Sequence, residues 1–158
     1  MHLTRYTDYS LRVLIYLAVK GEERSTITEI ADRFAISRNH LMKVVQELNH
    51  RGYITAIRGK HGGLLLKRAP ESITLGELVR DTERDLGLVE CFGDDNECVI
   101  TPSCRLKPIL AEALGAFLAV LDRYTLADML GPQRGGLIQL LQIEDPAPPA
   151  AQALDAST

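Results

Sequence analysis

Apolar side chains recur at helical spacing over residues 5–20, and Gly21 ends the segment. The apolar positions cover more than one stripe of the predicted helix: Leu11, Val13, Leu14, Ile15, Tyr16, Leu17 and Ala18. A helix with so wide an apolar surface packs against neighbours on two sides. We therefore expect a well-buried first helix.

Two shorter helices are predicted after a polar loop. Thr28 is expected to cap a helix that ends at Phe34, and Ser37 to open another that runs to about His50. A tight turn at residues 35–36 joins them. The second helix buries four apolar positions: Leu41, Val44, Val45 and Leu48. Two short helices joined in this way make a helix-turn-helix.

The exposed face of the second helix of this pair is polar and basic. Its side chains can hydrogen-bond base edges or phosphates in a major groove, and the candidate DNA-binding residues are Ser37, Arg38, Asn39, His40 and Lys43. Many helical hairpins in unrelated proteins share this pattern, so taken alone it leaves DNA binding open.

The next segment reads as a hairpin with a basic tip. Residues 53–58 and 64–67 are predicted strands, and residues 59–63 form a flexible tip between them. Glycines there permit positive backbone dihedrals and close approach to phosphate. The candidate contacts are Arg58, Lys60, His61, Gly62 and Gly63. A basic tip directly after a helix-turn-helix predicts a winged helix.

The pattern beyond the hairpin divides the chain into four parts. A helix over residues 74–83 closes a winged-helix domain at residues 1–83, and residues 84–104 lack periodicity and are predicted to be a loop. Residues 105–130 hold a long amphipathic helix and a short following turn, and residues 131–158 are predicted to be a disordered tail. The fold class is mainly α with a small β-hairpin.

The long helix predicts a homodimer. Its apolar residues recur at intervals of three and four over residues 105–123, and a head of about 80 residues cannot cover them alone. The simplest partner is the same helix of a second copy. The resulting two-fold dimer would present two recognition helices to a palindromic operator.

Charge is distributed unevenly along the chain. Residues 1–70 hold 12 Lys and Arg against 6 Asp and Glu, whereas residues 71–158 hold 6 against 15. This is the footprint expected when only the head meets a polyanion, although charge fluctuates along any chain. The sequence shows neither a membrane-spanning run nor a secretory signal, so we expect a cytoplasmic protein without membrane contact.

Three cysteines, Cys91, Cys98 and Cys104, crowd into the predicted loop. An odd number argues against a disulfide framework, and soft thiolates favour zinc or an iron-sulfur cluster. Structural zinc sites use more closely paired ligands, so the wide spacing favours the cluster. Three thiols without a common role and a purely thiol-based redox switch remain alternatives.

The residues quoted so far resemble a known group of regulators. The matching positions are residues 5–10, Ile30-Ala31, Ile36-Ser37, Leu41, Leu48, residues 52–54 and residues 58–63. The resemblance is to the winged-helix regulators that include the cluster-biogenesis regulator IscR and the nitric oxide sensor NsrR, and it covers about residues 1–125. IscR-type proteins place a histidine ligand three residues after the last cysteine. Here that position is Lys107, so the chain is more similar to the NsrR group.

The resemblance implies a ligand set and a direction of control. It implies an iron-sulfur cluster, more readily 4Fe-4S than 2Fe-2S, held by the three cysteines with Asp8 as a fourth ligand. The alternative interpretation is that Asp8 binds no metal and is a carboxylate stabilised by the helix dipole at the N-terminus of the first helix. The implied function is a transcriptional repressor that loses operator affinity when its cluster reacts with nitric oxide.

Two other classes of function stay open at this point. A redox enzyme could use such a cluster, but the sequence has no nucleotide-binding glycine motif and an enzyme would leave the basic wing unexplained, so we expect no enzyme activity. A thiol- or zinc-based redox-responsive DNA-binding regulator of the same fold is the closer alternative.

Overall fold

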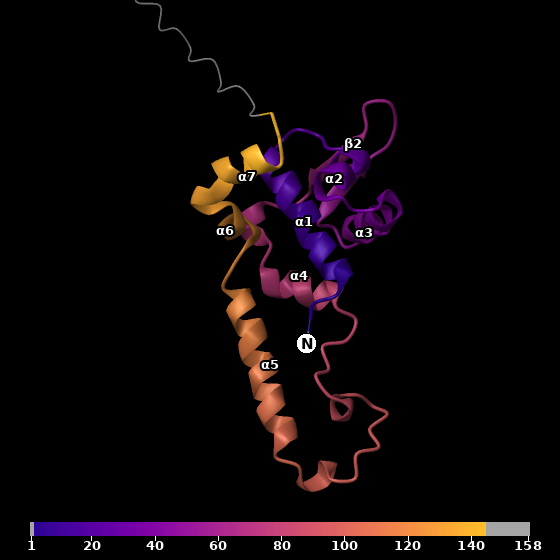
Figure 1. Cartoon of the computed structure of the whole chain (residues 1–158), viewed down its shortest axis with the longest axis vertical. Helices are drawn as coiled ribbons and strands as arrows, with labels where there is room; N and C mark the ends of the chain where they lie inside the picture. Colours follow the sequence, from indigo (N-terminus) through magenta and orange to yellow (C-terminus); the bar gives the residue numbers. More distant parts are fainter. Residues whose placement is uncertain (1, 145–158) are drawn as a thin grey trace, which may run out of the picture.

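The structure is a computed structural model that describes residues 2–144. It has a helical head with a two-stranded antiparallel wing, and one long helix extends away from the head (Figure 1). The helices are α1 (Arg5–Lys20), α2 (Ile27–Phe34), α3 (Arg38–His50), α4 (Leu75–Thr82), α5 (Leu106–Asp122), α6 (Leu126–Leu130) and α7 (Arg134–Leu140). The strands are β1 (Ile54–Ile57) and β2 (Gly63–Leu66). The predicted fold class, mainly α with a β-hairpin, is confirmed.

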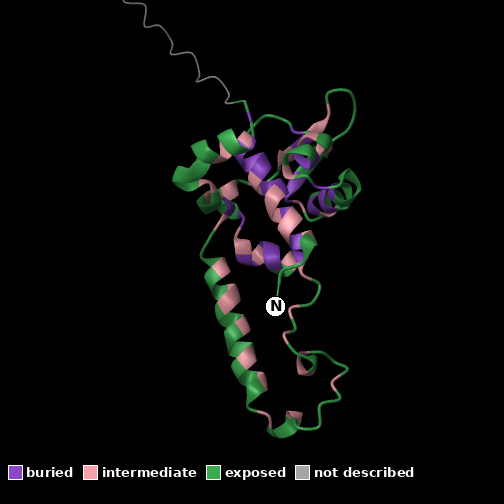
Figure 2. Cartoon of the chain, viewed as in Figure 1, coloured by how far each residue is buried: buried purple, intermediate pink, exposed green. Residues whose placement is uncertain are grey.

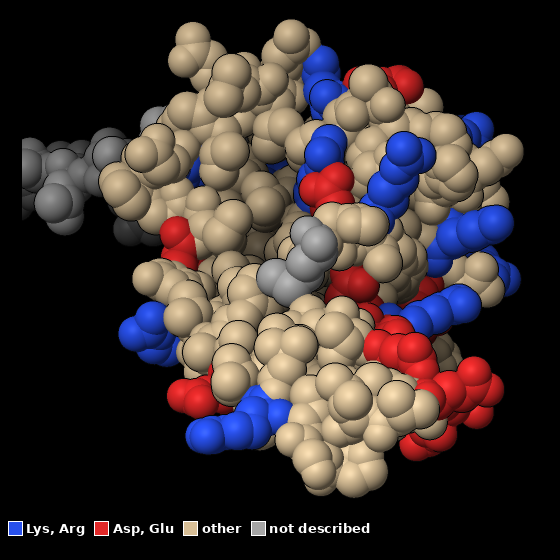
Figure 3. Space-filling view, turned by 60° about the horizontal axis from the view of Figure 1, so that its bottom comes forward, with Lys and Arg blue, Asp and Glu red and all other residues tan. Residues whose placement is uncertain are grey.

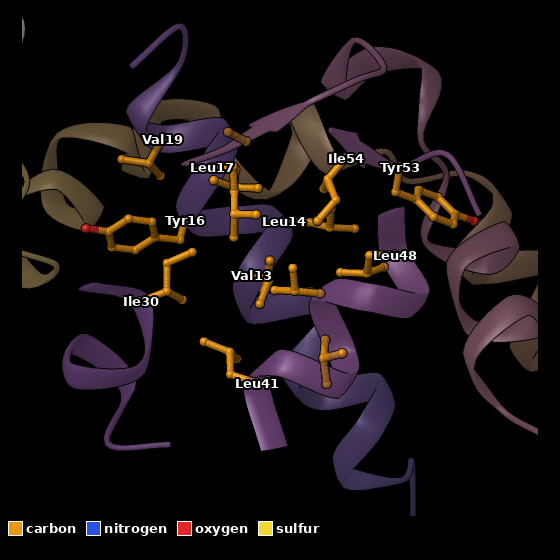
Figure 4. Close-up of a cluster of buried hydrophobic side chains, with 14 of the residues drawn as sticks. Val13, Leu14, Tyr16, Leu17, Val19, Ile30, Leu41, Leu48, Tyr53 and Ile54 are labelled. Atoms are coloured by element: carbon orange, nitrogen blue, oxygen red, sulfur yellow. The ribbon is translucent and has the colours of Figure 1, made fainter. Parts of the chain in front are cut away.

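Helix α1 runs through the centre of the head and is buried on several sides. Its side chains meet those of α2, α3 and β1 in one apolar cluster, which Figure 4 shows around α1. Val13 and Leu14 are fully buried, and Tyr16 and Leu17 are 1% exposed. The expectation of a well-buried first helix is confirmed, because its apolar surface faces more than one neighbour.

Helix α2 begins two residues earlier than predicted. Thr26, rather than Thr28, is its N-cap: its hydroxyl accepts from Glu29 N at 3.1 Å, and the Glu29 carboxylate accepts from Thr26 N at 3.2 Å. Burial raises the pKa of Glu29, but hydrogen bonds donated by Lys20 and Tyr16 outweigh burial and lower it. The charged carboxylate therefore caps α2 and joins it to α1.

The C-terminal end of α5 is fixed to α4. Arg80 forms a two-pronged ion pair with Asp122, at 2.6 and 2.7 Å, and backbone hydrogen bonds join residues 73–75 to residues 124–126. Gly76 makes this approach possible, because a Cβ there would lie 1.9 Å from an Asp122 carboxylate oxygen. The remainder of α5 extends from the head and has no buried residue (Figure 2).

The head includes residues beyond the predicted boundary at residue 83. Leu126 of α6 is fully buried in the main core, and Leu141 and Ile143 are each 8% exposed in the same cluster. Arg134 donates to the Val19 carbonyl at 2.9 Å, at the end of α1. The predicted disorder of residues 131–144 is therefore wrong, since α7 packs on α1; residues 145–158 of that predicted tail lie outside the described residues.

Shortening the chain tests the role of α7 in the head. A chain ending at residue 133 loses the buried Leu141 and Ile143, so its free energy of unfolding should fall by about 3 kcal/mol. A chain ending at residue 144 keeps both side chains and serves as the control. Urea denaturation at one protein concentration measures the difference, and equal midpoints for the two chains would show that α7 contributes nothing to the head.

Candidate DNA-binding surface and cysteine loop

Helix α3 and the wing border one open groove of about 880 Å³. Seven of the ten predicted DNA-binding residues line it, and the five that carry side chains are Arg38, Asn39 and Lys43 from α3 and Arg58 and Lys60 from the wing. All five are exposed. The structure therefore brings the two halves of the predicted DNA interface together on one face of the head.

The other predicted DNA contacts have different local roles. Ser37 is the N-cap of α3, and its hydroxyl accepts from His40 N at 3.2 Å. His40 and His61 are exposed but lie outside the residues that line the groove. The His61 carbonyl accepts a hydrogen bond from Arg24, which fastens the tip of the wing to the loop before α2.

Both glycines at the end of the wing tip are required by the wing itself. A Cβ on Gly62 would lie 2.2 Å from the Ile57 carbonyl oxygen, and Gly62 N donates to the Gly59 carbonyl at 2.9 Å. Gly63 has a φ of +154°, and a Cβ there would lie 2.9 Å from the Arg24 Cβ. Gly62 and Gly63 also line the groove, so a close approach of phosphate remains compatible with their position.

Sequence reasoning missed several residues that line the groove. They are Thr26, Thr28, Met42 and Asn49. Met42 and Asn49 continue the exposed face of α3 at helical spacing from Asn39 and Gln46, so periodicity could have found them. Asn49 also accepts a hydrogen bond from Ala56 N at 3.0 Å, which joins α3 to β1.

The cysteine loop runs from residue 83 to residue 105 and joins α4 to α5 (Figure 1). Cys91 lies in a single helical turn at Glu90–Phe92, Cys98 follows Glu97, and Cys104 lies two residues before α5. All three thiols are free; Cys98 is exposed and the other two are half-buried. Hydrogen bonds inside the loop order it: Asn96 accepts from Cys98 N at 3.1 Å, and Glu90 accepts from Glu97 N at 2.7 Å.

The predicted ligands are not gathered into one site in the single chain. Among residues 2–144, no three His, Cys, Asp or Glu side chains lie together as a metal site. Asp8 is instead paired with Arg12, one helical turn away, at 2.8 Å. Arg12 also lies over the rings of Tyr9 and Phe34, 5.8 Å from each centroid.

The end of the molecule that carries α5 and the loop is rich in uncharged surface. Figure 3 turns this end toward the reader and shows a wide uncharged area with acidic side chains gathered at one edge. Three apolar side chains of α5 are strongly exposed, Leu106 at 56%, Ile109 at 58% and Val120 at 43%. With Ala113 and Ala116 they form a stripe at alternating spacings of three and four residues.

A helix-turn-helix followed directly by a basic wing defines the chain as a winged-helix DNA-binding transcriptional regulator. Residues 3–132 match the Rrf2 family, described as iron-dependent transcriptional regulators. The chain belongs to the Rrf2 family.

Two bacterial relatives are named NsrR. The chain is 55% identical over 132 residues to the HTH-type transcriptional regulator NsrR of Bacillus licheniformis, covering 82% of this chain and 92% of the relative. It is 51% identical over 147 residues to NsrR of Bacillus subtilis, covering 92% and 100%. These relatives are named as transcriptional regulators, which are not enzymes, as the sequence predicts.

Solved structures of the same superfamily share the fold. CymR, the global cysteine regulator of B. subtilis, is 30% identical with a TM-score of 0.66, over 82% of this chain and 95% of that one. IscR of T. potens is 27% identical with a TM-score of 0.63, over 82% and 86%. The oxidized form of Staphylococcus aureus CymR is 26% identical with a TM-score of 0.65, over 83% and 97%.

Neutralising the wing tests the groove. Arg58→Ala and Lys60→Ala should weaken binding to operator and random DNA alike, because each removes a cation that displaces counterions from phosphates. The slope of log affinity against log salt should become shallower by about 0.9 for each lost phosphate contact. Lys67→Ala removes an exposed lysine outside the groove lining and is the control. Fluorescence anisotropy over a salt series measures the slopes, and an equal change in Lys67→Ala would contradict the assignment.

Proposed function

We propose that this chain is a dimeric transcriptional repressor that binds a palindromic operator and senses nitric oxide through an iron-sulfur cluster. Cys91, Cys98 and Cys104 hold the cluster. The observation that carries the proposal is the position of these residues: all three are free thiols on the loop that joins the DNA-binding head to α5. The description of the family as iron-dependent supports iron as the metal.

The donor set fits an iron-sulfur cluster by its chemistry. Three thiolates are the ligands that such clusters prefer, and Cys98 is exposed on a loop that has no strand or long helix to hold it rigid. Because the described thiols are not gathered, the loop has to close around the cluster as it binds. A 4Fe-4S form agrees with a fourth ligand from outside the loop.

Dimerisation uses the exposed stripe of α5. The stripe has the spacing of a helix-helix seam, at residues 106, 109, 113, 116 and 120. A row of exposed apolar side chains along one helix is typical of an interface. The two small alanines at the centre of the stripe allow the backbones of two copies of α5 to approach closely. A two-fold axis at this seam places two wings and two α3 helices on one DNA duplex.

When bound, the cluster supplies the iron that reacts with nitric oxide. This chain's residues convert the loss of its thiolate bonds into a change of shape. Cys104 lies two residues before α5, so a cluster held by its thiolate would restrain the start of the dimerisation helix, and loss of that bond would free it. The other end of α5 stays fixed to α4 by the Arg80–Asp122 pair. The helix can then turn about that fixed end and alter the relative position of the two recognition helices.

Asp8 of the partner subunit is the proposed fourth ligand. Within one chain Asp8 pairs with Arg12, but both side chains are about two-fifths exposed, at 45% and 40%. An exposed pair of this kind contributes about 0.3–0.5 kcal/mol, so exchanging it for a bond to iron costs little. A carboxylate oxygen is a hard ligand beside thiolates and leaves its iron the easiest to attack.

A thiol-based redox regulator of the same fold is the second candidate. The exposed thiol of Cys98 favours it, because oxidation follows exposure of the thiol. A zinc-bound form belongs to the same alternative. A colourless protein that binds operator fully when purified without oxygen would favour this candidate over the cluster.

Removing the cysteines tests the proposed sensor. Cys91→Ala, Cys98→Ala and Cys104→Ala should each lose most of the visible absorption of anaerobically purified protein, because each thiolate is one of few protein bonds to iron. Operator affinity should fall at least about tenfold with it. Val99→Ala alters a neighbouring side chain that is 90% exposed and should change neither property. Full absorption and unchanged affinity in all three cysteine variants would remove the loop from the sensor.

Substituting Asp8 tests the fourth ligand. Asp8→Ala should keep most of the cluster but change its rate of reaction with nitric oxide, whereas Asp8→Cys should slow that reaction because a thiolate binds iron more firmly. Asp32→Ala removes an exposed carboxylate of α2 and is the matched control. Stopped-flow absorption measures the rates. Wild-type rates in both Asp8 variants would leave Asp8 with its role beside Arg12 at the start of α1.

A further inference from the structure

The last turn of α4 and its C-cap contact two separate parts of the head, Tyr53 and the start of α1, just before the cysteine loop begins. Asp81 accepts from the Tyr53 hydroxyl at 2.6 Å, and Thr82 lies 2.9 Å from the Thr7 hydroxyl. Glu83 is the C-cap of α4 and contacts the start of α1. A displacement of the start of the loop would therefore act first on these contacts.

Glu83 contributes most of the bonds to α1. One of its carboxylate oxygens accepts from Thr4 N at 2.8 Å and from the Thr4 hydroxyl at 3.1 Å, and the Thr7 hydroxyl also lies against it. The single hydroxyl proton of Thr7 has three acceptors within reach, the Glu83 carboxylate and the hydroxyls of Thr82 and Thr4, and a charged carboxylate is the strongest of them. The Glu83 carboxylate thus gathers three donors from the first turn of α1.

These bonds are not needed to cap α1. The Thr4 hydroxyl already accepts from Thr7 N at 3.3 Å as the N-cap of the helix. Thr4 is exposed, so its amide could instead bond to water at little cost. Glu83 therefore adds a connection between two elements rather than stability to one helix.

Glu83 lies between the cysteine loop and the first turn of α1, so it can connect the two. On one side it continues into the loop with Cys91, Cys98 and Cys104; on the other it holds the turn that contains Asp8. A second branch starts two residues earlier, where Asp81 lies 3.7 Å from Arg51, the C-cap of the recognition helix α3. The loop is thus joined to both α1 and α3 through one turn of α4.

We propose that Glu83 is a positioning residue that passes the state of the cysteine loop to the DNA-binding head through Thr4 and Thr7 of α1. The inference rests on the proposed function, since it names the route by which that sensor acts. Glu83 binds neither DNA nor the cluster in this role. Its carboxylate makes the start of α1 move with the start of the loop.

The matched variants are Glu83→Ala, Glu83→Gln and Asp85→Ala. Glu83→Ala removes the bonds that Glu83 itself makes to Thr4 and Thr7, whereas Glu83→Gln keeps a neutral oxygen that accepts more weakly. Asp85→Ala removes the same charge two residues later, where the carboxylate accepts from Gly87 N at 2.6 Å within the loop. The measured quantity is the ratio of operator affinities with and without the cluster in the full dimer.

Glu83→Ala should reduce that ratio at least about fivefold while visible absorption stays at the wild-type level. Glu83→Gln should give an intermediate ratio, and Asp85→Ala the wild-type ratio. A wild-type ratio in Glu83→Ala, or an equal loss in Asp85→Ala, would overturn the proposal. Loss of visible absorption in Glu83→Ala alone would make Glu83 a ligand and would overturn it as well.

Amide hydrogen exchange of the cluster-free protein gives a readout that does not depend on the cluster. Exchange of Thr4 N–H, followed by NMR, should be faster in Glu83→Ala than in the wild type or Asp85→Ala, because the amide loses its acceptor. If wild-type affinity proves independent of the cluster, the proposed function fails. Faster exchange then retains Glu83 as the residue that joins α1 to the loop, and unchanged exchange removes that connection too.

Discussion

Burial of α1 on several sides is the constraint on which the rest of the structure depends. The helix contacts α2, α3, β2, α4, α6 and α7, so one apolar surface fixes the recognition helix, the wing and the C-terminal helices against each other. Tyr16 shows how polar ends are accommodated in this core: its ring is 1% exposed, and its hydroxyl reaches the Glu29 carboxylate at 2.7 Å. Burial and the Glu29 carboxylate both raise the pKa of Tyr16, so the phenol stays a donor.

The connection between the head and α5 is of a different kind. It depends on the Arg80–Asp122 pair, on Gly76 and on short backbone bridges at one end of the helix, while the other end continues from the cysteine loop. The Arg80 guanidinium lowers the pKa of Asp122, so the pair stays charged over the neutral range. A rigid head with a helix fixed at one end suits a sensor placed at the other end.

Sequence periodicity predicted the elements whose register is determined locally. Residues 5–20 and the polar face of α3 follow from spacing alone, because a buried helix shows its period directly. The start of α2 can also be predicted from the sequence, because Thr26 and Glu29 have the spacing of a capping box. The predicted cap at Thr28 is wrong by two residues.

Elements that depend on distant contacts could not be predicted in this way. Helix α7 begins with Arg134 and two glycines, which favour no helix by themselves, and it forms because Leu141 and Ile143 bury against the head. The partners of Glu83 lie 76 and 79 residues away, so no spacing rule connects them. The proposed gathering of the cysteines would likewise depend on a ligand, and the sequence shows only that the thiols share a loop.

The strength of the junction limits what one subunit can achieve as a switch. The bonds of Asp81 and Glu83 are partly exposed, and each bond of this kind contributes about 0.5–1.5 kcal/mol. A change from nearly full to nearly absent DNA binding requires about 5.5 kcal/mol of differential affinity, which the four bonds of one junction reach only at the upper end of this range. In a two-fold dimer both junctions act on the same duplex, so their free energies add and their effects on affinity multiply. In the proposed dimer the seam along α5 would therefore do more than double the number of contacts to DNA, because it would combine two weak, reversible connections into one switch of sufficient size.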